Sequence, residues 1–260
     1  MSDADQAPRA RSLPPPSPEL VARARAFRDA GGQAAPAKPS ATVILLRDGI
    51  AGPEVFMIRR LTAMAFAGGM HVFPGGVVDP ADAASGDAEA ALAVAAIRET
   101  FEETGILLAD GPPADPEILE ADRLALIAHR VTFAGVCARH GLTPRPHDLR
   151  SWAHWVTPDF EPRRYDTRFF VAIAPGSQVA RDVGGESDAA AWVTPAKALE
   201  ACANREWLLM PPTETTLREL LDFACAADIF ESAALRDVRP LRTSIDLDRD
   251  PPRFVCRPES

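Results

Sequence analysis

Hydrophobic residues are distributed along this chain in two patterns, short apolar runs and longer segments with helical spacing. Short runs rich in β-branched and aromatic residues, bounded by glycine, proline or polar residues, predict strands. These predicted strands cover residues 41–46, 54–61, 152–156, 167–174 and 190–193. Apolar residues recurring every three or four positions predict helices. These predicted helices cover residues 18–31, 88–104, 116–140 (with a break), 213–227 and a segment that begins at Pro195. Strands before, between and after helices predict a layered α/β domain.

The two ends of the chain differ from the middle. Residues 1–17 are rich in proline and polar residues and predict a disordered tail. Residues 239–257 are interrupted by prolines and predict a hairpin or an extended arm. We therefore expect residues 1–37 to form a partly disordered tail with one short helix. We expect residues 38–260 to form a single domain with a helical and extended addition at its C-terminal side.

Three carboxylates are concentrated at the end of the predicted helix 88–104. Glu99, Glu102 and Glu103 are spaced i, i+3, i+4 and share one helical face, just before Gly105, which should end the helix. Like charges at this spacing repel, and the helix macrodipole disfavours anions at the C-terminal end. A sequence that breaks two local rules in one place indicates a functional site. Bound Mg²⁺ or Mn²⁺ is the simplest compensation, because hard cations bind carboxylate oxygens.

A glycine-rich segment precedes this helix. The run Phe73-Pro74-Gly75-Gly76 predicts a tight turn, because successive glycines permit positive φ and a close approach of the backbone to a ligand. Residues 79–87, between this run and the helix, predict a surface loop.

Composition and charge narrow the function classes. The 260 residues are 47% hydrophobic, which permits a substantial core, and the formal net charge of −9 argues against a general nucleic-acid binder. No run of 18 apolar residues occurs, so we expect no membrane association, and the N-terminus lacks the apolar core of a signal peptide. The four cysteines form no C-x-x-C pair, which predicts a reducing, cytoplasmic location and buried apolar thiols. A homodimer is left open.

The run Arg98-Glu99-Thr100-Phe101-Glu102-Glu103-Thr104-Gly105-Ile106 resembles the core of the Nudix box, REUxEExGU, where U is apolar. Thr100 is a mild departure at the first U position. With the upstream glycines and the strand pattern, the likeness extends over about residues 40–200. The resemblance implies the Nudix fold, a mixed β-sheet sandwiched between helices in an α/β/α arrangement, with additional helices at the C-terminal side.

The resemblance also implies the activity and the roles of individual residues. Nudix proteins hydrolyse a nucleoside diphosphate linked to another group, with Mg²⁺ or Mn²⁺. By this resemblance Glu99, Glu102, Glu103 and the carbonyl of Gly75 are metal ligands, and one glutamate, with Glu102 as our candidate, activates the attacking water. Arg98 pairs with the glutamates of such boxes, and its i, i+4 spacing to Glu102 permits that pair here.

The box departs from the usual spacing. The full pattern places a glycine and a glutamate at fixed distances before the arginine, and those positions are Ala84 and Ala90 in this chain. If Gly76 is the box glycine, the segment before the helix carries about eight extra residues relative to the family pattern. The outlying glutamate then has no clear equivalent, with Glu89 one residue away from its place.

An expanded box of this kind resembles the peroxisomal-type coenzyme A and acyl-CoA diphosphatases. The likeness includes FPGGVVDPAD, WVTPDFEPRRYDTRFFVA and LMPPTETTLREL. A stricter motif of other CoA-cleaving Nudix enzymes, LLTxRSx3Rx3Gx3FPGG, is matched at Arg60, Gly69 and Phe73–Gly76, while its serine and second arginine are replaced by Leu61 and Ala65. The resemblance therefore implies CoA or acyl-CoA as substrate, giving 3',5'-ADP and a phosphopantetheine product.

Residues outside the box are candidates for substrate and metal contacts. Arg60, Arg164 and Arg168 are candidate phosphate contacts, because guanidinium binds phosphate with two parallel hydrogen bonds. Each also fits an ordinary surface charge, and Arg60 is favoured by its motif position. Glu186 is a candidate for an extra metal ligand or base, and an exposed loop glutamate is the alternative.

Three functions remain open at this point. The first is metal-dependent hydrolysis of CoA, acyl-CoA or another nucleotide derivative such as NADH, ADP-ribose or a dinucleoside polyphosphate. The second is a Nudix-fold ligand-binding regulator without catalysis, which the retention of all three glutamates disfavours. The third is a housecleaning or RNA-cap hydrolase, and the acidic net charge argues against long RNA substrates.

Overall fold

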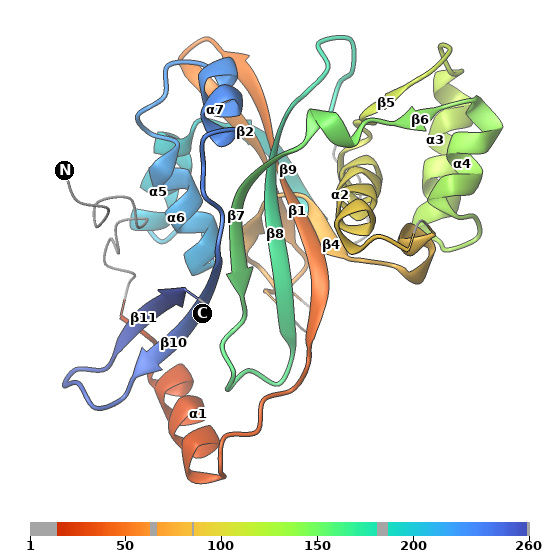
Figure 1. The fold of residues 1–260 in the computed structure, drawn as a ribbon. Coiled ribbons are helices and arrows are strands. Elements are labelled where there is room, and N and C mark those ends of the chain that lie inside the picture. Colours follow the sequence, from red (N-terminus) through yellow and green to blue (C-terminus); the bar gives the residue numbers. More distant parts are fainter. Residues whose placement is uncertain (1–14, 63–66, 85, 181–186, 259–260) are drawn as a thin grey trace.

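The computed structural model describes residues 15–62, 67–84, 86–180 and 187–258, and nine of the described strands form one mixed sheet (Figure 1). The strands of this sheet are β1 (Ala37–Gly49), β2 (Gly52–Arg60), β3 (His71–Val72), β4 (Gly75–Val77), β7 (Arg150–Val156), β8 (Arg164–Ile173), β9 (Ser187–Val193), β10 (Pro240–Asp246) and β11 (Arg253–Pro258). Their order is β11-β10-β7-β8-β1-β2-β3, with β4 paired to β1 and β9 paired to β2. Two short strands, β5 (Ala109–Asp110) and β6 (Thr143–Pro144), form a separate ladder.

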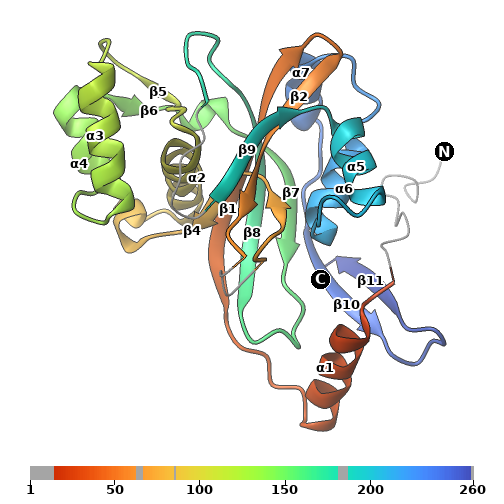
Figure 2. The ribbon, with the colours of Figure 1, turned by 180° about the vertical axis from the view of Figure 1, so that it is seen from behind.

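Helices cover both faces of the sheet (Figures 1 and 2). They are α1 (Pro18–Asp29), α2 (Ala88–Thr104), α3 (Pro116–Ile127), α4 (Phe133–His140), α5 (Pro195–Ala203), α6 (Pro211–Glu219) and α7 (Ala226–Ala233), together with the 3₁₀ helices η1 (Pro80–Ala83) and η2 (Pro146–Asp148). Helices α2, α3 and α4 lie on one side, and α5, α6 and α7 lie on the other. This arrangement confirms the predicted α/β/α layering.

Strand β1 lies at the centre of the sheet and divides the core in two. It runs parallel to β8 and antiparallel to β2 and β4. Val43 and Leu45 are packed in the cluster that includes the apolar face of α2, whereas Ile44 and Leu46 are packed in the cluster that includes α6 and α7. Successive side chains of a strand point to opposite faces, so one apolar run serves both layers.

The predicted helices and strands are largely confirmed, and the largest error concerns residues 213–227. The pattern predicted one helix there, but the structure contains α6 and α7 with a break between them. Phe223 in this break packs edge-on against Trp152, and the backbone N–H of Ala226 donates to Asp48 Oδ1 at 2.7 Å. These tertiary contacts redirect the chain, and helical spacing alone does not reveal them.

Two loop predictions before α2 are also corrected. Gly75 and Gly76 do not form a tight turn, because they belong to β4 and pair with Thr42 and Ala41 of β1. Residues 79–87 are not wholly a surface loop, because η1 forms there and buries Asp82. The pairing of the glycines depends on a distant strand, whereas η1 begins at a local capping box formed by Asp79 and Asp82.

The N-terminal helix and the C-terminal hairpin lie near each other. Ser17 caps α1 by accepting a hydrogen bond from the backbone of Leu20. Arg28 of α1 contacts Asp248 in the turn between β10 and β11 at 3.2 Å. Residues 239–257 thus form a hairpin, whose strand β10 pairs in parallel with β7. Most of the predicted disordered tail lies outside the described residues.

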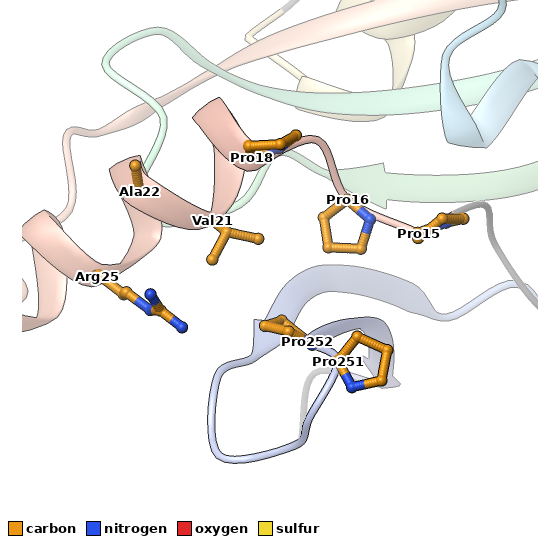
Figure 3. Close-up of a pocket in the computed structure, with 8 residues that line it drawn as sticks. All are labelled: Pro15, Pro16, Pro18, Val21, Ala22, Arg25, Pro251 and Pro252. Carbon is orange, nitrogen blue, oxygen red and sulfur yellow. The ribbon is translucent and has the colours of Figure 1, made fainter.

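A shallow groove of about 350 Å³ lies between α1 and this hairpin (Figure 3). Prolines from both segments and Val21 line it, and it contains none of the candidate glutamates. The groove is therefore a feature of the packing between the ends of the chain. Among the described residues, no helix is both long enough and apolar enough to cross a membrane.

Candidate active site

Helix α2 brings the three glutamates to its C-terminal end. The helix begins after Asp87, whose side chain accepts a hydrogen bond from the backbone of Glu89 at 3.0 Å. It ends at Gly105, which has the left-handed conformation (φ 73°) that favours glycine. Both ends match the bounds predicted from sequence. The helix packs against β1 and β4, so its acidic end lies beside the segment Phe73–Gly76.

Two of the glutamates contact this segment directly. Glu103 Oε2 accepts a hydrogen bond of 2.7 Å from the backbone N–H of Gly75. The carboxylate of Glu99 lies against Gly76, where a Cβ atom would come within 2.3 Å of Glu99 Oε1. A side chain at position 76 would therefore occupy the space of a carboxylate, which explains why the chain has glycine there.

The buried guanidinium of Arg98 joins the acidic residues. Its Nη1 donates to Glu99 Oε1 at 2.8 Å and to Glu102 Oε1 at 3.1 Å, so the pair predicted from the i, i+4 spacing is present. Its Nε and Nη2 atoms contact Asp82, and Nη2 also donates to the carbonyl of Val77 at 2.9 Å. Arg98 thus connects α2, η1 and β4.

The electrostatics of this cluster follow from burial and close charges. Burial opposes the charged form of Arg98, but the hydrogen bond to Asp82 and the charges of Asp82, Glu99 and Glu102 outweigh it, so the Arg98 pKa is raised. Burial also raises the pKa of the Glu102 carboxyl, and the positive charge of Arg98 only partly offsets this effect. Glu102 is therefore a stronger base than an exposed glutamate.

The donor chemistry of the cluster fits a hard divalent cation, because the three glutamates and the carbonyl of Gly75 offer only oxygen atoms. Within the described part of the chain, however, no three His, Cys, Asp or Glu side chains already converge on one point. Glu99 and Glu102 are held by Arg98, and Glu103 is held by the Gly75 backbone. Convergence on one cation requires at least one of these carboxylates to rotate.

Arg123 of α3 supports the end of α2, and sequence reasoning missed it. Its Nη1 donates to the backbone carbonyl of Glu102 at 2.7 Å, and its Nε donates to Glu120 Oε2 at 2.9 Å. A cation at a helix C-terminus offsets the macrodipole, which reduces the cost of placing anions there. No motif around Arg123 signals this contact, because it joins two separate helices.

Arg168 lies on the same face of the sheet as the acidic cluster. It pairs with Ala41 of β1, and Ala41 pairs with Gly76 on its other side, which places the Arg168 and Gly76 Cα atoms about 10 Å apart. Its Nη2 donates to Glu89 Oε1 of α2 at 3.0 Å, across an exposed ion pair. Arg168 therefore lies on the side of the sheet that α2 covers, and its ion pair is with the start of that helix.

Arg164 differs from Arg168 although both lie on β8. Its side chain is buried, and its guanidinium donates to the carbonyls of Thr157 and Ala35 and to Asp159. It lies four residues from Arg168, about 13 Å along the strand. Its hydrogen bonds are used within the fold, so the structure gives Arg164 a structural role in place of the predicted phosphate contact.

Arg60 is the last residue of β2, the strand that neighbours the central strand β1. Phe56 and Ile58 pack in the cluster beneath α2, and the register between β2 and β9 shifts between Arg59 and Arg60. Its backbone pairs with Ser187 at the start of β9. Glu186, the candidate extra ligand or base, directly precedes Ser187 and lies outside the described residues.

A profile of the family described as NUDT19 Nudix domain matches residues 85–220, just over half of the chain. The match includes the whole of α2 with its three glutamates and extends through α6. It begins after β4 and η1.

Curated relatives and a solved structure agree with this match. The chain is 27% identical over 246 residues to the acyl-coenzyme A diphosphatase NUDT19 of Gallus gallus, with 70% of this chain and 65% of the relative covered. It is 30% identical over 176 residues to the putative nudix hydrolase 7 of Caenorhabditis elegans, with 64% and 55% covered. The chain thus spans less than two thirds of the length of these relatives. The crystal structure of a NUDIX hydrolase from Alicyclobacillus acidocaldarius is 31% identical, with a TM-score of 0.63 and coverage of 75% of this chain and 96% of that one.

Proposed function

Because this chain belongs to the Nudix hydrolase family, in the group described as NUDT19 Nudix domain, we propose that it hydrolyses the diphosphate linkage of coenzyme A or an acyl-CoA. The products would be 3',5'-ADP and a phosphopantetheine derivative. The observation that carries the proposal is the joining of the glutamates at the end of α2 to the Phe73–Gly76 segment, through the hydrogen bond between Gly75 and Glu103. The name of the Gallus gallus relative, an acyl-coenzyme A diphosphatase, supports the choice of substrate.

Nudix hydrolases generally need a divalent metal, and we propose Mg²⁺ or Mn²⁺ here. Glu99, Glu102, Glu103 and the carbonyl of Gly75 would hold it, and when bound it supplies positive charge that offsets the charge of the diphosphate. The same oxygens are available to either ion, so their chemistry does not choose between the two.

Within this site we assign Glu102 as the base that takes a proton from the attacking water. The place of Glu102 in the acidic cluster supports this role, because Arg98 holds its Oε1 atom beside Glu99. Glu103 accepts a hydrogen bond from the Gly75 N–H and would be one of the ligands that hold the cation. Arg98 orients Glu99 and Glu102 through its Nη1 atom.

We propose that Arg168 and Arg60 contact the phosphates of the substrate. Arg168 is supported by its place on the face of the sheet that α2 covers. Its ion pair is with the exposed Glu89, and a substrate phosphate can displace the Glu89 carboxylate. Arg60 is supported by its motif position, at the end of β2. Glu186 stays a proposed extra ligand or base, on the ground that it directly precedes Ser187, which pairs with Arg60.

We also propose a small-molecule nucleotide derivative, and not nucleic acid, as the partner of this site. The net charge of −9 supports this choice, because a polyanion would be repelled over most of the surface. A cytoplasmic location is proposed because all four cysteines are free thiols, as in a reducing compartment.

A substrate panel tests the proposal. The purified chain is incubated with Mg²⁺ or Mn²⁺ and CoA, acyl-CoA, NADH, ADP-ribose, a dinucleoside polyphosphate or an oxidised dNTP, and the products are separated by chromatography. We expect 3',5'-ADP from CoA or acyl-CoA at the highest kcat/KM. Preferential cleavage of another panel member would refute the CoA assignment, while tight binding of a ligand with no turnover would favour a non-catalytic regulator.

The Glu103→Gln variant tests the assignment of the site. We expect a loss of about 10³-fold or more in kcat, because the substitution removes a negatively charged ligand of the proposed cation. Glu117→Gln is the matched control, since Glu117 is an exposed glutamate in the first turn of α3. Circular dichroism establishes that both variants are folded, and full activity of Glu103→Gln would overturn the role of Glu103.

A further inference from the structure

The segment between β4 and α2 contains a buried carboxylate that the proposed mechanism does not use. Asp82 lies in η1, and only 2% of its side chain is exposed. It belongs to the stretch that makes this box longer than the family spacing. The positions at which that spacing expects a glycine and a glutamate are Ala84 and Ala90. Asp82 therefore supplies a buried negative charge that those positions lack.

Asp82 occupies one edge of the Arg98 guanidinium. Arg98 Nε donates to Asp82 Oδ1 at 3.1 Å and to Oδ2 at 3.2 Å, and Nη2 donates to Oδ2 at 3.0 Å. Only the remaining nitrogen, Nη1, donates to Glu99 and Glu102. The guanidinium is planar, so fixing its Nε–Nη2 edge also fixes the direction in which Nη1 points.

The backbone in turn holds Asp82. Its Oδ2 accepts a hydrogen bond of 2.8 Å from the backbone N–H of Asp79. The side chain of Asp79 accepts a hydrogen bond from the backbone of Ala81 at 2.8 Å, and it also accepts one from the backbone of Asp82, which completes a reciprocal capping box at the start of η1. Asp82 is therefore set by local structure, and Arg98 takes its orientation from Asp82.

The orientation of Arg98 affects how the glutamates can bind a cation. Arginine prefers to form two parallel hydrogen bonds with one carboxylate. Without Asp82, Arg98 Nε loses its carboxylate partner and Nη2 keeps the carbonyl of Val77, so the guanidinium can turn and form this fork with Glu99 or Glu102. A carboxylate paired in that way is turned towards Arg98 and is no longer available to bind a cation together with the other glutamates.

We propose that Asp82 is a positioning residue of the acidic cluster, which engages the Nε–Nη2 edge of Arg98 so that Arg98 contacts Glu99 and Glu102 through Nη1 alone. The role of the cation in this inference rests on the proposed function. The contact between Asp82 and Arg98 does not.

Manganese binding without substrate tests the inference directly. Mn²⁺ is titrated into the wild type and into Asp82→Asn, and binding is followed by electron paramagnetic resonance of the free ion. We expect the dissociation constant to rise about 10- to 100-fold in Asp82→Asn, the range typical when a residue that orients a metal ligand is changed. In turnover of CoA we expect kcat to fall by a similar factor with KM for CoA nearly unchanged. An unchanged dissociation constant for Mn²⁺ would overturn the inference.

Asp159→Asn is the matched control for a general loss of stability. Asp159 pairs with Arg164 and Arg242, so this variant also breaks contacts between an aspartate and an arginine, at a place remote from the glutamates. We expect Asp159→Asn to lower the thermal stability and to leave Mn²⁺ affinity unchanged. Equal losses of Mn²⁺ affinity in the two variants would show that Asp82 acts only through stability, and would overturn the inference.

A second variant covers the case in which Asp82→Asn does not fold. Arg98→Lys keeps the positive charge, but lysine has a single ammonium nitrogen. It cannot engage Asp82 with one edge of a planar group while another nitrogen contacts the glutamates. We expect the same rise in the Mn²⁺ dissociation constant, and wild-type affinity in Arg98→Lys would overturn the inference. A wild type that binds Mn²⁺ and fails to cleave CoA would refute the CoA substrate alone, since the binding comparison still reports on Asp82.

Discussion

The carboxylate of Glu103 accepts a hydrogen bond of 2.7 Å from the backbone N–H of Gly75. This bond joins residues 28 positions apart, one at the end of α2 and one in a strand that pairs with the centre of the sheet. The acidic cluster is therefore fixed to the sheet by backbone, and its geometry depends on the absence of side chains at positions 75 and 76.

Replacing Gly76 with alanine should impair the site with little effect on the fold. The added Cβ would lie within 2.3 Å of Glu99 Oε1, so the Glu99 carboxylate must move. The atoms that it meets are the end of a flexible side chain, so we expect a change of less than about 1 kcal/mol in the free energy of unfolding. We expect kcat on the best panel substrate to fall about 100-fold.

Gly75→Ala and Gly176→Ala complete this comparison. A Cβ at position 75 would meet the backbone carbonyl of Ala41 at 2.4 Å, so β4 would be forced from β1 at a cost of about 1–3 kcal/mol. Gly176 has open space around it, and its replacement should leave urea unfolding and kcat unchanged. Wild-type turnover by Gly76→Ala would show that the contact between Gly76 and Glu99 has no part in catalysis.

The sequence predicted those parts of the site that local signals specify. Helix α2 has the predicted bounds because Asp87 caps its start and Gly105 ends it, and both signals lie within a few residues of the helix. The i, i+4 spacing likewise predicted the pair between Arg98 and Glu102. The α/β/α layering followed from the order of apolar runs, since each run must bury its faces against another element.

The parts that sequence reasoning missed depend on pairing between distant segments. Gly75 and Gly76 looked like a turn, because nothing nearby shows that β1 is available as a partner. The buried Asp82 looked like part of a surface loop, although its spacing to Asp79 is that of a capping box. That spacing was the one local signal that could have indicated η1.

Glu102→Gln should stabilise the protein at neutral pH. Burial raises the folded-state pKa of Glu102 above its ordinary value of 4.5, so the unfolded chain releases this proton first as pH rises. Stability from the protonated form is full below pH 4.5, declines as pH rises through the raised pKa, and is absent at higher pH. Glutamine keeps the neutral form at every pH, and we therefore expect the variant to be more stable than wild type at pH 7 and equal to it near pH 4.

Urea unfolding at the two pH values, with a chelator present, measures this difference. Glu117→Gln, at an exposed position, should show no gain at pH 7. The same Glu102→Gln protein should lose about 10³-fold in kcat, because its amide cannot accept the proton of the attacking water. A lower free energy of unfolding for Glu102→Gln at pH 7 would contradict the burial argument.

The arginines of β8 should separate binding from stability. Arg168→Ala removes an exposed ion pair with Glu89, so we expect a change of less than about 1 kcal/mol in the free energy of unfolding. We expect a several-fold rise in KM for CoA if Arg168 binds a substrate phosphate. Arg164→Ala removes the buried hydrogen bonds to the carbonyls of Thr157 and Ala35, while Asp159 keeps its pair with Arg242. This should cost about 1–3 kcal/mol, with KM nearly unchanged. Urea unfolding measures the stability of both variants, and steady-state kinetics measures their KM for CoA. A higher KM at wild-type stability in Arg164→Ala would mean that Arg164 contacts the substrate.

The buried thiol of Cys137 should make the stability fall in alkaline solution. Burial raises the pKa of Cys137 from 9.0 to about 11, so the unfolded chain ionises first. The contribution of this thiol is full below pH 9.0 and is lost as pH rises towards 11, with a total loss of about 3 kcal/mol for a shift of this size. Burial also raises the pKa of Cys202 and Cys256, so part of the decline will persist in a Cys137→Ala variant. Free energies of unfolding in urea from pH 7.5 to 10.5 should therefore fall more steeply for the wild type than for Cys137→Ala, and parallel curves would mean that the Cys137 thiol ionises as readily in the folded chain as in the unfolded one.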